Sequence, residues 1–120
     1  MPPRSRDPEA LIPLKQSSYR VLLTLTDGEW RHGYAIMQAV SQMTDGREPI
    51  LPGTLYAALA RMVDDGLVEV REAADDEHSG GPPRRYYRRT SFGRAVARAE
   101  SERLRALLDI AVAQKIIGNK

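Results

Sequence analysis

The spacing of the apolar residues changes twice along this chain of 120 residues, and these two changes constrain the fold more than any other feature. Up to residue 66, apolar side chains recur every three or four positions, which is typical of helices that bury one face. Two short segments, 67–72 and 84–89, break that spacing and favour strands. Helical spacing then returns and continues to about residue 117. The sequence therefore predicts helices, then a β-hairpin, then one long helix.

Three helices are expected before the hairpin, over residues 13–26, 33–44 and 52–65. Pro13 and Pro52 suit the first turn of a helix, where no backbone N–H is needed. Gly66 suits a helix end. The third helix should bury a stripe of residues spaced at i, i+4 and i+7: Leu55, Leu59 and Met62.

The final helix is longer than the rest of the chain can cover. Thr90 or Ser91 can cap its start, and a helix from there to residue 117 would span roughly 40 Å. Its excess apolar stripe predicts contact with another subunit. The expected fold class is mainly α with a small β-hairpin, a winged helix-turn-helix plus a long C-terminal helix. We expect a flexible N-terminal arm over 1–12, the winged domain over 13–90 and a dimerisation helix over 91–120.

Composition excludes several classes of protein. The chain has no cysteine and only two histidines, His32 and His78, so no metal site is expected. No catalytic motif or phosphate-binding glycine loop is found, so we expect neither an enzyme nor a cofactor. No apolar run approaches the roughly 20 residues that cross a bilayer, and the first residues do not form a secretory signal. We therefore expect a soluble, cytoplasmic protein that does not enter a membrane.

Three segments together resemble the PadR-type transcriptional regulators. They are HGYAI at 32–36, PGTLYAALARMVDDGLV at 52–68 and GGPPRRYYRRTSFGR at 80–94, in the family's order and at about its spacing. The resemblance implies a homodimeric, DNA-binding repressor that responds to a small molecule or a stress signal, with dimer contacts through the first and last helices. With one C-terminal helix, the chain resembles the short form of the family.

The chain departs from the family's pattern at two positions. Arg89 stands where the family commonly has a leucine, so a core contact at the base of the wing should be lost or the strand register should differ. Ala57 stands where the family often has a proline, so the first turn of the third helix should be less rigid.

The third helix and the hairpin supply the candidate DNA contacts. Small residues opposite the core stripe, Ala58 among them, would let the backbone approach a major groove, and Arg61 could reach a guanine edge or a phosphate. A solvated helix face with an Arg61–Asp65 pair would explain the same residues. Tyr86 and Tyr87 should face opposite ways. The full set of DNA-binding candidates is Tyr34, Thr54, Tyr56, Ala57, Arg61, Arg84, Arg85 and Arg88.

The remaining candidates concern assembly and regulation. Trp30 and Phe92 are candidates for a pocket that binds a small hydrophobic or aromatic effector, although Trp30 would equally serve as a packing aromatic. The expected partner is double-stranded DNA with an inverted-repeat operator, half-sites about one turn apart. The alternative is a winged-helix protein-interaction module that does not read DNA. The dimerisation candidates are Leu14, Val21, Leu25, Leu104, Leu107, Leu108 and Ala111.

Overall fold

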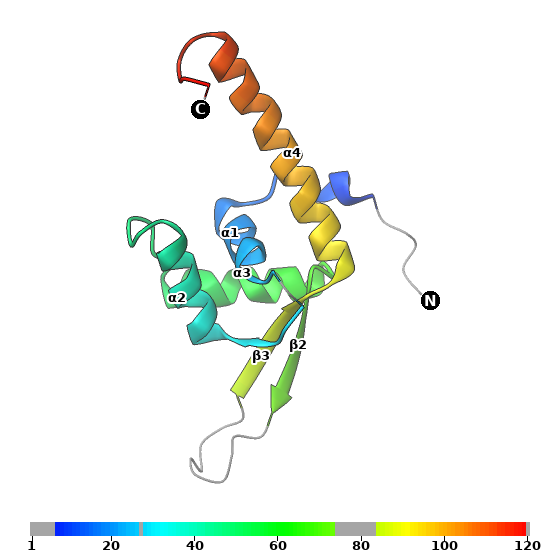
Figure 1. Ribbon diagram of the computed structural model, residues 1–120. Coiled ribbons are helices and arrows are strands. Elements are labelled where there is room, and N and C mark those ends of the chain that lie inside the picture. The colour runs from blue at the N-terminus through cyan, green and yellow to red at the C-terminus, as the bar shows by residue number, and fades with distance from the viewer. Residues whose placement is uncertain (1–6, 27, 74–83, 120) are drawn as a thin grey trace.

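The computed structural model describes residues 7–26, 28–73 and 84–119. Within these residues, helices dominate and a small antiparallel sheet forms the wing, so the predicted fold class is confirmed. The wing and the end of the last helix leave the helical body on opposite sides (Figure 1). The elements are the 3-10 helix η1 (Pro8–Leu11), α1 (Gln16–Thr24), β1 (Arg31–His32), α2 (Gly33–Met43), α3 (Pro52–Asp64), β2 (Val68–Ala73), β3 (Arg84–Arg89) and α4 (Ser91–Ala113).

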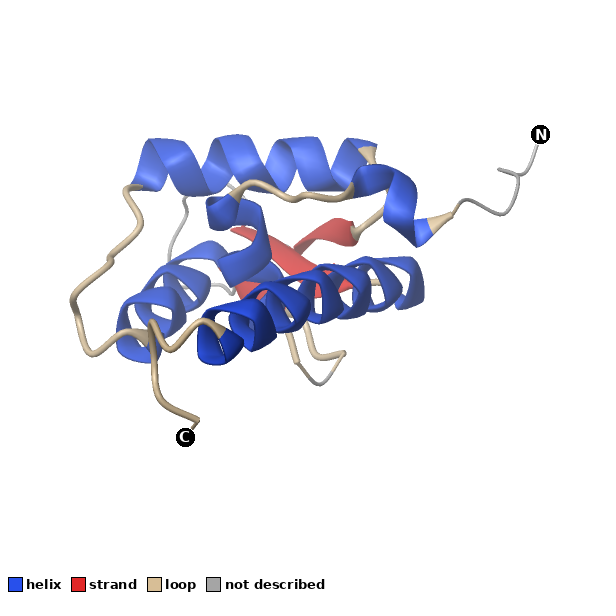
Figure 2. Cartoon of the chain, turned by 90° about the horizontal axis from the view of Figure 1, so that it is seen from above, coloured by secondary structure: helices blue, strands red, loops and turns tan. Residues whose placement is uncertain are grey.

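The core lies where α1, α2, α3 and the first half of α4 meet. Helices lie on both sides of the strands when the molecule is seen from above (Figure 2), and α1 packs against both α3 and α4. The predicted stripe of α3 is confirmed, because Leu55, Leu59 and Met62 are all buried. Ala58 was placed on the outward face, and this is wrong. It is 0% exposed, since it follows Leu55 by three residues and so shares its side of the helix.

The sheet has a third strand that the sequence did not indicate. Its order is β1-β3-β2, with β3 antiparallel to both neighbours. In β1, Arg31 pairs with Tyr87 and His32 with Tyr86. Two residues are too few to show alternation, so β1 has no readable signal.

The expectation of a flexible arm is wrong for residues 7–12. Asp7 accepts a hydrogen bond from the backbone N–H of Glu9 and thereby caps η1. Leu11 and Ile12 then pack against the core, because they are apolar and η1 contacts α4. Residues 1–6 lie outside the described residues. Helix α1 begins at Gln16, three residues after the expected start.

The start of α4 is joined tightly to the base of the wing. The hydroxyl of Thr90 donates to the carbonyl of Gly66 at 2.7 Å and accepts from the N–H of Gly93 at 2.9 Å, which is the expected helix cap. A Cβ on Gly93 would lie 2.1 Å from the carbonyl oxygen of Leu67, so only glycine allows this approach. Among the described residues, no helix combines the length and the apolar character that crossing a membrane requires.

Candidate nucleic-acid-binding surface and the apolar groove

The outward face of α3 carries small and polar side chains. Thr54, Ala57 and Arg61 are exposed, as the spacing predicted. Tyr56, for which the spacing allowed either a packed aromatic or a groove contact, is also exposed. Gly53, in the first turn, has open space where a side chain would lie. The backbone of this turn can therefore approach a large partner closely. Ala57 does not interrupt the helix, which is continuous from Pro52 to Asp64.

The first turn of α2 joins this face. His32 caps the helix, because its Nδ1 accepts a hydrogen bond from the N–H of Tyr34 at 3.2 Å. A Cβ on Gly33 would lie 2.4 Å from the Tyr56 hydroxyl oxygen, so the Tyr56 ring covers Gly33. Tyr34 is exposed, and its hydroxyl accepts from Gln38. Tyr34 and Tyr56 thus flank a helix N-terminus, where free N–H groups favour anions such as phosphates.

One face of the wing joins arginines to aromatic rings. Arg88 donates twice to the same Glu69 carboxylate oxygen, at 2.7 and 3.0 Å. Its guanidinium carbon lies 4.4 Å from the centre of the Trp30 ring, and that of Arg71 lies 4.5 Å from the same centre. Both distances are within the range of cation–π attraction. Arg88 is therefore held by two partners, and the structure does not present it as a free DNA contact.

The other face of the wing turns toward the helices. Tyr87 is buried and Tyr86 is not, so the prediction that they face opposite ways is confirmed. Burial raises the pKa of Tyr87 above its ordinary value, although Arg85 beside it acts in the opposite direction. Arg85 also pairs with Glu72 at 3.3 Å. Arg84 and Arg85 are exposed, but strand alternation directs them to opposite faces, so they cannot grip one phosphate from one side.

Arg89, the departure from the family's leucine, forms hydrogen bonds. Its two terminal nitrogens donate to the carbonyl of Leu22 at 3.3 Å and to that of Thr26 at 3.0 Å, at the end of α1. The strand register stays regular, with Arg89 opposite Val68. Of the two alternatives for Arg89, a lost core contact or a different strand register, the second is therefore wrong. Hydrogen bonds to the end of α1 stand where a leucine would make apolar contacts.

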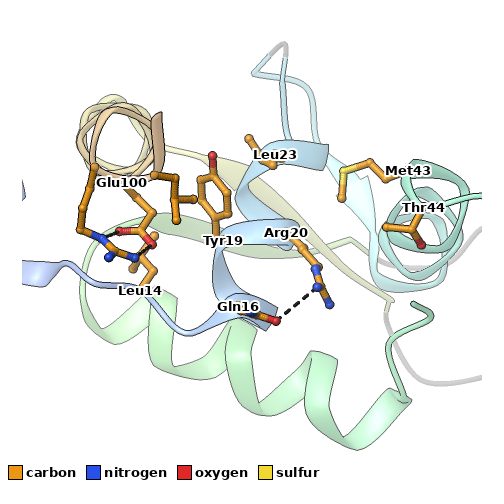
Figure 3. A pocket seen from close by; sticks show the side chains of 10 residues that line it. Leu14, Gln16, Tyr19, Arg20, Leu23, Met43, Thr44 and Glu100 are labelled. Carbon is orange, nitrogen blue, oxygen red and sulfur yellow. Dashed lines mark hydrogen bonds and ion pairs between the residues drawn. The ribbon is translucent and has the colours of Figure 1, made fainter. Parts of the chain in front are cut away.

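An apolar groove lies on the side of the molecule that faces away from the wing. It has a volume of about 420 Å³ and lies between α1, the end of α2 and α4 (Figure 3). Its apolar lining is Leu14, Leu23, Met43 and Leu104. Trp30 and Phe92 do not line it. Trp30 precedes β1 and its ring lies against Arg88 of the wing, and Phe92 packs against the core.

The dimerisation candidates divide into two groups. Val21 and Leu25 are buried in the core of their own chain, so their assignment to a subunit interface is wrong. Helical spacing alone cannot distinguish an inward stripe from an interface stripe. Leu107 and Leu108 are 52% and 56% exposed. The sequence missed Leu23, Met43 and Ile110, which are exposed large apolar residues.

Beside the groove, a partly buried ion pair lies within α4 and one side-chain hydrogen bond joins α4 to α1. Glu100 is 2% exposed and accepts two hydrogen bonds from Arg103, at 2.9 and 2.8 Å. These bonds lower the pKa of Glu100 and outweigh the opposing effect of burial. Ser101 donates to the carbonyl of Ala97, so its oxygen accepts from the Tyr19 hydroxyl at 2.6 Å. Within the described residues, no cluster of acidic and histidine side chains could hold a metal ion.

Known proteins share this sequence and this fold. The model of the transcriptional regulator PadR-like family matches residues 21–99. A PadR family regulator from Eggerthella lenta is 30% identical, with 82% of each chain covered and a TM-score of 0.61. PadR of Bacillus subtilis, solved in complex with operator DNA, is 18% identical with a TM-score of 0.61, over 72% of this chain and 46% of that one, and shows similarity of fold alone.

A sequence relative is similar over a shorter stretch. An uncharacterised protein of Lysinibacillus sphaericus is 39% identical over 75 residues. That stretch is 62% of this chain and 66% of the relative, so the match spans slightly less than two-thirds of that protein.

Proposed function

Because the chain belongs to the transcriptional regulator PadR-like family, we propose that it is a homodimeric repressor that binds an inverted-repeat operator in double-stranded DNA and is released by a small effector or a stress signal. The family match confirms the resemblance inferred from the three motifs. The family consists of transcriptional regulators and not of enzymes, which agrees with the absence of catalytic motifs in the sequence. We place the protein in the cytoplasm, where such a regulator would meet DNA.

The observation that carries the DNA-binding proposal is the shared surface of α2 and α3. Exposed Thr54, Ala57 and Arg61 would face a major groove, and Tyr34 and Tyr56 would face the flanking phosphates. The wing would place Arg84 in the adjacent minor groove, where a narrow groove attracts arginine. PadR of B. subtilis, which has a similar fold, was solved in complex with operator DNA, and this supports DNA as the partner.

The dimer proposal rests on the second half of α4. Leu104 lines the groove beside α1, and the exposed Leu107 and Leu108 continue the same stripe along the helix. Exposed apolar patches of this kind mark interaction sites. A two-fold dimer places two α3 helices about one turn of DNA apart, which is why we expect an inverted repeat.

Because Trp30 and Phe92 do not line the groove, we propose the groove as the effector site in place of these two residues. Its volume of about 420 Å³ lies within the range of small-molecule sites. Leu14, Leu23 and Met43 favour an apolar or aromatic compound. A compound bound beside the dimer helices would change the separation of the two α3 helices, which would weaken operator binding.

The test is fluorescence anisotropy of a labelled duplex that carries the gene's own upstream region, with a scrambled duplex as control. We expect tighter binding to the upstream duplex and a steep loss of affinity with salt, by a log–log slope of about 0.9 for each phosphate contacted. Absence of binding even at low salt would contradict the proposal and favour the protein-interaction module. The pairing of Arg85 and Arg88 with glutamates is the observation that favours that alternative.

A further inference from the structure

We infer that Arg89 is a positioning residue, which fixes the direction of the wing by tying the end of β3 to the end of α1. The inference rests on the proposed DNA-binding function and deepens it. It divides the arginines of the segment RRYYRR into two groups. Arg84 and Arg85, at the start of β3, remain the candidates for DNA contact, and Arg88 and Arg89, at the base of the wing, hold the wing in place.

The contacts of Arg89 reach three elements. Its guanidinium donates to Leu22 in the last turn of α1 at 3.3 Å, and to Thr26 just beyond the end of that helix at 3.0 Å. Its Cγ lies 3.1 Å from the point where a Cβ on Gly93 would stand, so its aliphatic part passes along the first turn of α4. The base of β3, the start of α4 and the end of α1 therefore meet at one side chain.

The chemistry of this junction suits arginine in particular. The C-terminal end of a helix carries partial negative charge, which favours a cation, and Leu22 lies in the last turn of α1. The planar guanidinium can donate to two carbonyls at once, whereas a lysine ammonium is a point charge. The carbonyl of Leu22 also accepts from the N–H of Leu25, so it keeps one hydrogen bond when Arg89 is replaced. The contact with Thr26 is therefore the one that the variants test most directly.

The neighbouring residue holds the same segment from the opposite face of β3. Arg88 stacks on Trp30, which lies between α1 and β1, and Arg89 binds Thr26 in that same connection. Successive strand residues point to opposite faces, so the two side chains enclose the α1–β1 connection from both sides. This arrangement restricts rotation of the wing relative to α1, the helix that lines the groove.

The experiment compares the full-length protein with three variants, Arg89→Leu, Arg89→Lys and Arg94→Leu. Leucine is the residue that the family commonly has here, and it can occupy the space beside Gly93 without donating to Thr26. Arg94 is exposed and lines the same shallow hollow as Arg89, so Arg94→Leu removes an equal charge without breaking a bond to α1. Thermal unfolding shows that each variant is folded, and the lysine variant remains informative if the leucine variant is not.

Two readouts are measured, one with DNA and one without. With the labelled upstream duplex, we expect Arg89→Leu to lose about tenfold in affinity, as for one or two hydrogen bonds to a charged group. Arg89→Lys should recover only part, and Arg94→Leu should lose less than threefold, as expected for a screened surface charge. Without DNA, amide hydrogen exchange in β2 and β3 should be faster in Arg89→Leu than in the control.

A double-mutant cycle with Arg84→Gln separates positioning from direct phosphate contact. If Arg89 acts through the wing, Arg84→Gln should cost less affinity in the Arg89→Leu background than in the wild type. Additive losses with full rescue by lysine would overturn the inference, because they are expected of a phosphate contact. Unchanged hydrogen exchange would overturn it too, even if the wild-type protein binds no DNA and the proposed function fails.

Discussion

Helices α3 and α4 both bury one face in the core and leave another uncovered, but the two uncovered faces differ in chemistry. The face of α3 carries Thr54, Ala57 and Arg61, which are small or polar. The second half of α4 carries Leu107 and Leu108, which are large and apolar. Small and cationic residues suit the close approach of a polyanion, whereas large apolar side chains are stabilised only when another apolar surface covers them.

The difference teaches that exposure alone does not identify a partner. A solvated helix face needs no explanation when its residues are charged, but exposed leucines in a row do. We therefore propose α3 as the face that meets nucleic acid and the second half of α4 as the face that meets a second copy of the chain. Each of the following changes alters one of these faces, or its junction with the core, and leaves the other intact.

The largest effect should come from charging the apolar face of α4. Burial of one leucine contributes about 1.5–3 kcal/mol, and two-fold symmetry counts each leucine twice. Because both leucines are already about half buried in one chain, the double variant Leu107→Lys with Leu108→Lys should lose about 3 kcal/mol or more of dimerisation free energy. Light scattering on a sizing column should show a monomer. Circular dichroism should show nearly unchanged helical content, because both residues are exposed.

Asp109→Lys provides the matched control. It adds the same total charge, and at 100° per residue it lies on the side of α4 opposite the apolar stripe. This variant should remain a dimer. A dimer that persists in the leucine double variant would remove α4 from the interface and contradict the comparison.

A second change acts where α4 joins the wing. Gly93→Ala would place a methyl group 2.1 Å from the Leu67 carbonyl oxygen, which is backbone and cannot move aside. We expect a loss of about 3 kcal/mol in the free energy of unfolding, the upper end for overpacking. Gly53→Ala in the first turn of α3 meets nothing within 4 Å, and should raise stability by up to about 1 kcal/mol. Urea denaturation measures the free energy of unfolding of both variants. Equal effects would show that the first turns of α3 and α4 are packed alike.

The contrast between these helices also shows how much the sequence could predict. The order of the elements and the buried stripe of α3 follow from periodicity, because apolar spacing depends on local geometry alone. The assignment of Val21 and Leu25 to an interface failed for the same reason. Periodicity shows that one face is covered, and only the packed structure shows whether the cover is the chain itself or a partner.

The candidate site was predictable to a smaller extent. Thr54, Ala57 and Arg61 are exposed on one face as expected. The roles of Arg88 and Arg89 depend on contacts with Trp30 and Thr26, which lie about 60 residues earlier in the chain. No pattern within the segment RRYYRR encodes such long-range contacts. The tip of the wing, residues 74–83, lies outside the described residues.

A smaller effect is expected from the exposed face of α3. Arg61→Ala should weaken binding to the upstream duplex by about 1–3 kcal/mol and relax the preference at one base position, as for a lost guanine contact. Arg98→Ala is the control, because Arg98 is an exposed arginine on α4 that pairs with Glu102 at 3.2 Å. Anisotropy with a set of single-base operator variants measures both effects. Equal losses in the two variants would mean that Arg61 acts only through net charge.

The smallest effect concerns Glu100, which lies where the covered half of α4 gives way to the exposed half. Its pKa is lowered in the folded chain by the hydrogen bonds from Arg103. A lowered folded-state pKa contributes stability above the unfolded value, and this stability is lost as the pH falls below about 4.3 and through the folded value. Glu100→Gln should therefore flatten the acid limb of a stability–pH curve measured by urea denaturation. Glu102→Gln alters an exposed pair and should leave the limb nearly unchanged. Equal flattening by both variants would contradict the assignment of this stability to the hydrogen bonds between Glu100 and Arg103.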